Sequence, residues 1–323
     1  MTHTALRAAT RSSPLARWQT QHICDLLLHA APDLQTDPVF VDTLGDRTQP
    51  IGTPLHQIGG QGVFVKEVQA AVLEGRADFA VHSAKDLPST ATPGLTIAAI
   101  PVRGDARDVL IGKAFAAIPV GGSVATGSVR RRAILSAARP DLVFSELRGN
   151  IGSRLEKAKG FDAIVMAYAP LQRLGLTDHV AEVLSPNRML PMVGQGAIAI
   201  ECRADDDRMV ELLRLINDPV SYAAVTAERA FLAELGSGCD LPVAALAVPY
   251  ETIGDPADST VDAPLELSLD APLELSLDAL VASEDGSAII RVDEGGFDPI
   301  ALGQLVASMI LERGGGDLLR RRP

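Results

Sequence analysis

Two segments of the chain share one design, and that design limits the possible folds more than any other feature of the sequence. Residues 73–88, LEGRADFAVHSAKDLP, and residues 156–174, EKAKGFDAIVMAYAPLQRL, each run from a helix end through glycine to an aspartate and a short apolar strand. Small or polar residues follow both strands. Units of this kind build parallel sheets, whose functional residues collect at the carboxyl ends of the strands. The sequence therefore predicts two similar α/β domains that face one cleft.

Helix-start signals agree with this interpretation. Ser13-Pro14 supplies an N-cap and a first-turn proline before LARWQTQHICDLLLHA. The segment VRRRAILSAA follows the polar triplet TGS and stops before Pro140. A short helix is expected in GNIGSRLEKAKG and a long one over residues 218–238.

Beyond about residue 240 the pattern changes to alternating apolar and polar residues. LPVAALAVPY, LELSL and SAIIRVDE read as strands, with SEDGS as a turn, and DPIALGQLVASMILER follows as a helix. We expect a small C-terminal α+β domain with an antiparallel sheet. The octapeptide DAPLELSL at 262–269 recurs at 270–277, which we interpret as a local duplication that lengthens a loop or hairpin far from the chemistry.

Composition narrows the class of ligand. The chain has 323 residues, enough for two or three domains, and a formal charge of −12, so a nucleic-acid groove is not expected. Only five of its 29 basic residues are lysines, which leaves 24 arginines. Genome composition accounts for part of this bias. Recognition of carboxylate or phosphate, which suits the planar guanidinium, is the other explanation.

Three cysteines without framework spacing predict a reduced, intracellular protein. The N-terminal residues have no apolar signal-peptide core, and no stretch is long enough for a membrane span. We therefore expect a cytoplasmic protein. Metal-ligand spacing is absent, and IGGQGVF matches neither a dinucleotide fold nor a P-loop.

Arginines at helix starts and strand ends form the first candidate site. Three consecutive arginines open the helix that begins near residue 129, where the helix dipole disfavours cations. Unless these side chains spread into solvent, an anion is expected to bind there, and its ligand would carry several carboxylates or phosphates. The candidates are Arg11, Arg130, Arg131, Arg132, Arg148, Arg154 and Arg173.

Asp86 and Cys239 are the other two candidates. Asp86 lies just beyond the strand 79–83, where a carboxylate can give a proton to a leaving group, stabilise a cation and take a proton back. The alternative is a capping or ion-paired aspartate, with Lys85 as the obvious partner. Cys239 lies in the glycine-rich turn GSGCDLP, where an accessible thiol could act as a nucleophile, or it is an inert loop cysteine. His82 reads as a hydrogen-bonded core histidine.

Six motifs in register resemble the porphobilinogen deaminase family, also called hydroxymethylbilane synthases: ATRSSPLA, VHSAKDLP, LRGNIGSRL, GQGAIAIECR, VTAERAF and GSGCDLP. The resemblance spans residues 5 to about 245 and implies that the chain joins four porphobilinogen molecules head to tail into hydroxymethylbilane, with release of ammonia. It also implies a dipyrromethane cofactor, bound through a thioether to Cys239, with Asp86 as the catalytic acid and base. The acetate and propionate groups of each pyrrole would explain an arginine-lined cleft in an acidic protein.

The resemblance assigns further residues and a domain plan. Ser13, Ser83, Lys85, Thr126 and Ser128 join Arg11, Arg130, Arg131, Arg148, Arg154 and Arg173 as groups for cofactor or substrate carboxylates, whereas Arg132 falls where the family varies. It implies a monomer with two domains similar to periplasmic binding proteins. We expect domain 1 at 1–101 and 196–218, domain 2 at 102–195 and domain 3 at 219–323.

Three departures bear on ligand binding. Gln57 and Gln61 stand where the family often has lysines, and Gly127 replaces a common serine. We expect these changes to alter substrate affinity or chain movement and to leave the chemistry intact. Two rival hypotheses remain: a non-catalytic binding protein for a polycarboxylate ligand, and an inactive relative that binds a tetrapyrrole without making it.

Overall fold

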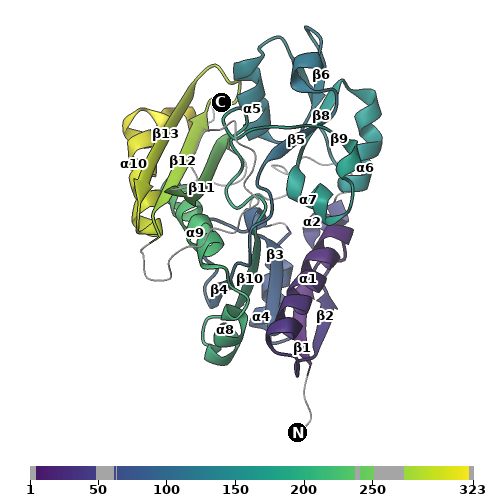
Figure 1. The fold of residues 1–323 in the computed structure, drawn as a ribbon, viewed down its shortest axis with the longest axis vertical. Helices are drawn as coiled ribbons and strands as arrows, with labels where there is room; N and C mark the ends of the chain where they lie inside the picture. The colour runs from purple at the N-terminus through teal and green to yellow at the C-terminus, as the bar shows by residue number, and fades with distance from the viewer. Residues whose placement is uncertain (1–4, 49–61, 63, 237–240, 251–272, 320–323) are drawn as a thin grey trace.

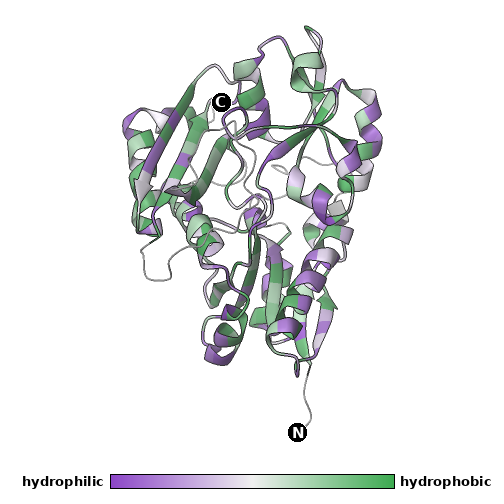
Figure 2. Cartoon of the chain, viewed as in Figure 1, coloured by the Kyte–Doolittle hydropathy of each residue, from purple (hydrophilic) through white to green (hydrophobic). Residues whose placement is uncertain are grey.

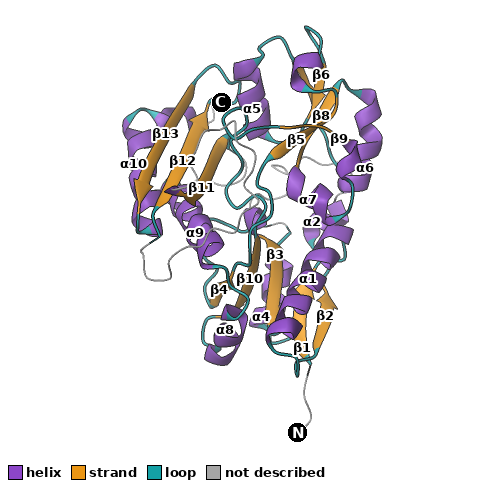
Figure 3. Cartoon of the chain, viewed as in Figure 1, coloured by secondary structure: helices purple, strands orange, loops and turns teal. Residues whose placement is uncertain are grey.

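A computed structural model describes residues 5–48, 62, 64–236, 241–250 and 273–319, and these form three β-sheets with helices packed against them (Figure 1). Two sheets have five strands each, and the third is a smaller antiparallel sheet that follows them in the chain. Figure 3 shows the two larger sheets one above the other, with the small sheet beside the upper one. The mixed α/β class with a small C-terminal antiparallel domain is confirmed.

The first five-stranded sheet has the order β2-β1-β3-β10-β4, in which β10 runs antiparallel to both of its neighbours. Alternate residues of its strands face opposite sides. Phe79 and Val81 pack with helices α1 and α8 on one face, whereas Ala80 packs with α4 on the other. The strands are β1 (Leu6–Thr10), β2 (Thr36–Phe40), β3 (Phe79–Ser83), β4 (Leu95–Ala99) and β10 (Ile198–Arg203), and the helices are α1 (Pro14–Ala30), α2 (Leu44–Thr48), α4 (Lys66–Leu73) and α8 (Asp207–Arg214).

The second five-stranded sheet repeats this plan with the order β7-β6-β8-β5-β9, and β5 is its antiparallel strand. Helix α5 covers one face, and α6 and α7 lie on the other. The shared topology confirms the expectation of two similar α/β domains. The strands are β5 (Asp108–Gly112), β6 (Ser123–Ala125), β7 (Val143–Ser145), β8 (Ala163–Ala167) and β9 (Val180–Val183), and the helices are α5 (Val129–Ala138), α6 (Ile151–Lys157) and α7 (Tyr168–Arg173).

The chain crosses between the two sheets twice. Residues 100–107 lead from β4 of the first sheet to β5 of the second, and residues 184–197 lead from β9 back to β10. Each antiparallel strand therefore begins directly after a crossover. The domain boundaries given above stay predictions.

The third sheet has the order β11-β12-β13, and helices α9 and α10 bury its inner face. Its other face contributes Ala244 and Leu280 to the core that α5 shares with the second sheet, so the small domain packs directly on α5. Figure 2 shows hydrophobic residues concentrated in the strands and on the helix faces turned toward them. The elements are β11 (Val243–Pro249), β12 (Leu275–Ala282), β13 (Ile289–Gly296), α9 (Pro219–Glu234), α10 (Pro299–Glu312) and α11 (Gly315–Leu319).

The expected local signals act where the sequence places them. Ser13 accepts a hydrogen bond from the Ala16 N–H and caps α1, and Ser128 does the same for the Arg131 N–H at the start of α5. The second copy of the duplicated octapeptide supplies the first three residues of β12, Leu275 to Leu277. The first copy lies outside the described residues.

Candidate active site

Asp86 lies at the end of a single helical turn, Ala84–Asp86, that follows β3 directly. The strand itself is buried, whereas Asp86 is half-buried and so can be reached from solvent. Hydrogen bonds hold the turn on both sides: the Ala84 N–H donates to the Ala197 carbonyl, and Arg229 of α9 donates to the Pro88 carbonyl at 2.8 Å. The core strand thus presents Asp86 on a fixed, accessible turn.

The polar residues just before Asp86 face the neighbouring elements of the first domain. Nε2 of buried His82 lies 3.2 Å from Oε2 of Glu201 on β10, and Gln69 donates to the same carboxylate at 2.8 Å. Ser83 exchanges hydrogen bonds with the Gln19 amide of α1. His82 is therefore a core histidine beside a carboxylate, and its burial agrees with the sequence-based interpretation. In the described part of the chain its Nε2 lies near Glu201 without the geometry of a hydrogen bond.

A pocket of about 150 Å³ brings together cationic residues from both α/β domains. Lys85 reaches it from the turn after β3, and Ser128 and two arginines reach it from the start of α5. Arg148 comes from the loop before α6, and Arg154 comes from α6 itself. Strand carboxyl ends thus meet here, as the parallel-sheet pattern predicts. The residues that line the pocket are Lys85, Gly127, Ser128, Arg130, Arg131, Leu147, Arg148, Arg154, Val165, Met192 and Gln195.

Like charges and burial alter the proton affinity of the pocket's cations. Burial, with the Arg131 charge, lowers the pKa of Lys85 to about 8, and the Asp86 carboxylate partly opposes this shift. Burial together with Arg131 and Arg148 lowers the pKa of Arg154 to about 10, again with Asp86 opposing. Asp86 is therefore close enough to the cluster to act on two of its members. An anionic ligand would relieve the same repulsion.

Asp108 is a member of this site that the sequence did not reveal. It is fully buried at the start of β5 and accepts hydrogen bonds from both Arg130 and Arg131, each with an Nη2–Oδ distance of 2.7 Å. Burial alone would raise the pKa of Asp108, but the two guanidinium groups outweigh it and hold the pKa at about 2. We expected an external anion to account for the arginines at this helix start, and the chain itself supplies one.

Several candidate residues lie outside this pocket. Arg11 pairs with Asp46 and stacks on the Phe64 ring, and Arg173 donates to the Gly196 carbonyl beside the Trp18 ring. Buried Thr126 accepts a hydrogen bond from the Ser128 N–H. The structure thus brings together Lys85, Ser128, Arg130, Arg131, Arg148 and Arg154, whereas Arg11, Ser13, Ser83, Asp86, Thr126 and Arg173 do not line the same pocket.

Cys239, Gln57 and Gln61 lie outside the described residues. Leu232 of α9 and Leu241, on either side of residues 237–240, line a small cavity together with Ser128 and Arg130. The described chain on either side of the predicted cofactor cysteine therefore shares a cavity with Arg130.

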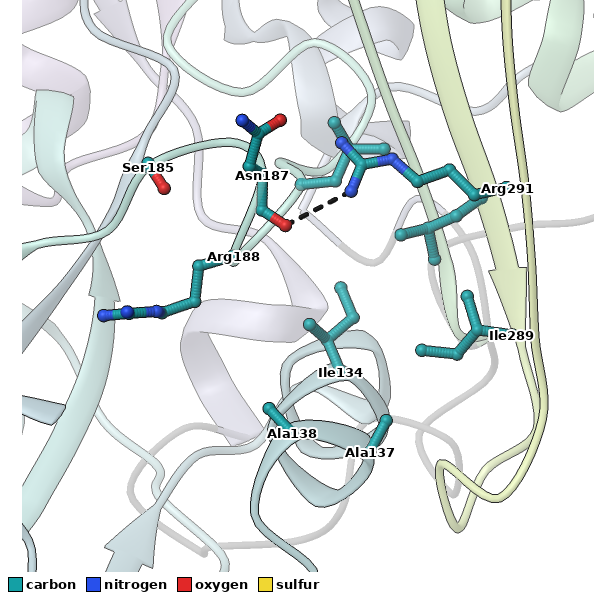
Figure 4. A pocket seen from close by; sticks show the side chains of 10 residues that line it. Ile134, Ala137, Ala138, Ser185, Asn187, Arg188, Ile289 and Arg291 are labelled. Carbon is teal, nitrogen blue, oxygen red and sulfur yellow. Dashed lines mark hydrogen bonds between the residues drawn. The ribbon is translucent and has the colours of Figure 1, made fainter. Parts of the chain in front are cut away.

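A larger cavity, about 520 Å³, lies elsewhere, between α5, the segment after β9 and the β12–β13 pair (Figure 4). None of the residues predicted for the site lines it. Its two arginines already have carboxylate partners, Glu182 for Arg188 and Asp278 for Arg291. Among the described ranges, no group of three or more His, Cys, Asp or Glu residues could hold a metal ion. In that same part of the chain, no helix is long and apolar enough to cross a membrane.

The fold and the pocket define a class: a multidomain α/β protein with a cation-lined pocket between its two α/β domains, close to a reachable aspartate. Two family models match the chain, "Porphobilinogen deaminase, dipyromethane cofactor binding domain" over residues 6–211 and "Porphobilinogen deaminase, C-terminal domain" over residues 222–312. The chain belongs to the porphobilinogen deaminase family, whose members bind a dipyrromethane cofactor.

Relatives along nearly the full length agree with this assignment. The chain is 42% identical over 321 residues to the porphobilinogen deaminase of Roseiflexus castenholzii, and the alignment covers 98% of each chain. It is 40% identical over 318 residues to the porphobilinogen deaminase of Brevibacillus brevis, and that alignment covers 97% of this chain and 96% of the relative. Among solved structures, a nutrient binding protein from Burkholderia cenocepacia bound to methionine aligns at 14% identity and a TM-score of 0.41, over 71% of this chain and 95% of that one.

Proposed function

We propose that Asp86 and the cationic pocket carry out the reaction of this family, in which four porphobilinogen molecules are joined into hydroxymethylbilane with loss of one ammonia each. The observation that carries the proposal is the pocket itself. Lys85, Arg131, Arg148 and Arg154 converge there from two domains, and Asp86 lies within electrostatic range of Lys85 and Arg154. A substrate with an acetate and a propionate on every ring suits this set of donors.

Asp86 has the chemistry that such a condensation needs. In each addition a proton reaches the substrate's amino group, the carbon–nitrogen bond breaks, and ammonia leaves. A carbon–carbon bond then forms between the substrate carbon that lost ammonia and the α-carbon of the terminal pyrrole in the primer or growing chain, and this attacking ring gives up its α-proton. One carboxyl group can donate the first proton, stabilise the positive charge left behind and accept the second proton. Half-burial on a fixed turn gives Asp86 both access and a constant position.

The cations of the pocket would bind and orient the carboxylates. Each hydrogen bond to a charged group contributes about 1.5–3 kcal/mol, so a few of them hold a small polyanion well. Lys85 and Arg154 gain most, because an anion stabilises the positive charge that burial among other cations disfavours. This set of donors also excludes a purely apolar ligand.

The same donors fit the acid groups of a dipyrromethane, since guanidinium, ammonium and hydroxyl groups all donate to carboxylates. When bound, the cofactor supplies the pyrrole carbon to which the first substrate is joined. We propose that Cys239 holds it through a thioether, with Lys85, Ser128, Arg131, Arg148 and Arg154 as its nearest charged and polar contacts. The cavity that Leu232 and Leu241 form with Arg130 supports this arrangement.

The remaining residues would contribute at the rim or through their neighbours. Arg11, Ser13, Ser83, Thr126 and Arg173 stay proposed contacts for substrate or growing chain. We further propose a cytoplasmic monomer whose partner is the small-molecule substrate, with neither nucleic acid nor membrane. Buried Cys24 and Cys202, which form no disulfide in the described part of the chain, suit a reducing compartment.

The experiment that tests this function is incubation of the purified protein with porphobilinogen, followed by assays for ammonia and for linear tetrapyrrole. We expect four molecules of ammonia for each tetrapyrrole. A binding protein for polycarboxylates would bind porphobilinogen and release no ammonia, and that result would overturn the proposal.

A further inference from the structure

Arg130 and Arg131 are two adjacent cations with almost no exposure to solvent, 4% and 7% respectively. They occupy the first turn of α5, where the helix dipole is also positive. Two buried, uncompensated charges of the same sign would be strongly destabilising. Some group must therefore hold this pair in place whether or not a ligand is bound.

Asp108 is that group, and each of its two carboxylate oxygens accepts hydrogen bonds from one of the arginines. Oδ2 accepts from Arg130 Nη2 at 2.7 Å. Oδ1 accepts from Arg131 Nη2 at 2.7 Å and from Arg131 Nε at 3.2 Å. One carboxylate thus bridges both guanidinium groups and fixes the plane of the Arg131 group through two of its nitrogens.

Backbone carbonyls fix the other end of each guanidinium group. Arg130 Nη1 donates to the Leu190 carbonyl at 2.6 Å, and Arg131 Nη1 donates to the Val165 carbonyl at 3.1 Å. Each arginine is therefore held between the β5 carboxylate and a second element. These contacts leave little freedom for either side chain to follow a ligand, so their positions are set before binding.

Gln195 ties Asp108 to the second crossover. Its Nε2 donates to Asp108 Oδ1 at 2.9 Å and to the Ala106 carbonyl at 2.7 Å. Its own backbone carbonyl accepts from Arg103 Nε at 2.8 Å. Asp108 therefore receives donors from α5 and from the crossover between the two sheets.

We propose that Asp108 is a positioning residue that, with Gln195, holds Arg130 and Arg131 in a fixed geometry for binding carboxylates. This inference rests on the proposed function of the pocket. Asp108 neutralises only one of the two charges, and Lys85, Arg148 and Arg154 line the same pocket. Asp108 and Gln195 therefore hold the two arginines in place, and the pocket still attracts anions.

The test uses three variants of increasing mildness. Asp108→Asn removes the charge with almost no change in shape, Asp108→Glu keeps the charge one methylene further out, and Gln195→Met removes one donor without altering any charge. Asp141→Asn is the matched control, because Asp141 forms a similar two-point pair with Arg139 at the end of the same helix, away from the pocket. Thermal unfolding identifies the variants that fold.

Three readouts separate positioning from a merely structural role. The first is the calorimetric Kd for porphobilinogen in an Asp86→Asn background, which requires no turnover. The second is the split between KM and kcat with Asp86 intact. The third is the fraction of protein that carries the added mass of two pyrrole units.

We expect Asp108→Asn to weaken porphobilinogen binding about tenfold or more and to lower cofactor loading, since it disrupts charged hydrogen bonds to both arginines. If that variant does not fold, Asp108→Glu and Gln195→Met decide the matter. Both should raise Kd and KM about threefold or more while kcat changes less, and Asp141→Asn should match the wild type.

A Kd and KM equal to those of the wild type in folded Asp108→Glu and Gln195→Met, with a lowered unfolding temperature alone, would show a structural role and overturn the proposal. Failure of the proposed function looks different. In that case the parent protein binds porphobilinogen but releases no ammonia, and the Kd comparison still tests Asp108. A protein that binds no porphobilinogen overturns both proposals.

Discussion

Arg103 and Glu228 form a largely buried ion pair that joins the first crossover between the two α/β sheets to helix α9, which packs on the third sheet. Arg103 Nη1 lies 2.5 Å from Glu228 Oε1, and Nη2 lies 3.2 Å from Oε2. The same carboxylate accepts the Gly194 N–H of the second crossover at 2.7 Å and the Ala247 N–H of β11 at 3.0 Å. Both crossovers and the third sheet therefore meet at one side chain that has no exposed surface.

Replacement of this carboxylate tests how far the domain arrangement depends on it. Glu228→Gln leaves Arg103 buried without its counter-charge, so we expect the free energy of unfolding to fall by about 3–5 kcal/mol, measured by urea denaturation. Glu74→Gln, which breaks the exposed pair with Arg76, should cost less than about 1 kcal/mol. Equal losses in the two variants would contradict a special role for Glu228.

The lowered pKa of Lys85 predicts a pH dependence of substrate binding. Lys85 attracts a carboxylate only while it is protonated, and burial beside Arg131 brings its pKa down to about 8. We therefore expect KM for porphobilinogen to rise as the pH increases from 7 to 9, with its midpoint near 8 in the free enzyme. Steady-state kinetics across this range would measure the effect.

The matched variant is Lys85→Arg, because a guanidinium group stays charged throughout the range. The rise of KM near pH 8 should disappear in it. An unchanged pH profile in Lys85→Arg would assign the titration to another group. The same pKa shift affects the stability of the unliganded protein in the opposite direction. The unfolded chain keeps this proton up to about pH 10.5, whereas Lys85 in the folded protein loses it near pH 8. Folding therefore becomes more favourable as the pH rises from about 8 to about 10.5.

Intact mass tests the proposed attachment of the cofactor. We expect the wild-type protein to carry the mass of two pyrrole units and Cys239→Ser to have the bare polypeptide mass, because a serine hydroxyl is a far weaker nucleophile than a thiol. Cys24→Ala, which changes a buried cysteine of α1, should keep the added mass. Two pyrrole units on the Cys239→Ser variant would place the attachment elsewhere.

The sequence predicted those parts of the fold that depend on local signals. Ser13 and Pro14 mark the start of α1, and Pro140 follows the end of α5. These signals act through interactions within a few residues, so they can be recognised from a single sequence. The glycine before each apolar strand likewise marks a local change of direction. The pocket arginines were predictable for the same reason, since they lie at a helix start.

The residues that were missed act through distant partners. Asp108 lies 22 positions before Arg130 and is the first residue of the apolar segment DVLIG. From the sequence alone, an aspartate at that position cannot be told from an ordinary polar residue at the end of a strand. Glu228 lies inside a helix and pairs with Arg103, which is 125 positions away. A charged residue that opens a fully apolar strand was the only available signal for Asp108. The part played by Cys239, Gln57 and Gln61 stays a prediction.

The most direct test of the catalytic role of Asp86 measures two quantities on one sample of Asp86→Asn: the rate of turnover and the intact mass. Asparagine keeps the shape and loses the proton that the condensation needs, and loss of a general acid and base costs about 10²–10⁴-fold in rate. We predict a variant that still carries two pyrrole units and releases ammonia from porphobilinogen at least about a hundredfold more slowly. Ammonia release at the wild-type rate by fully loaded Asp86→Asn would contradict the central claim.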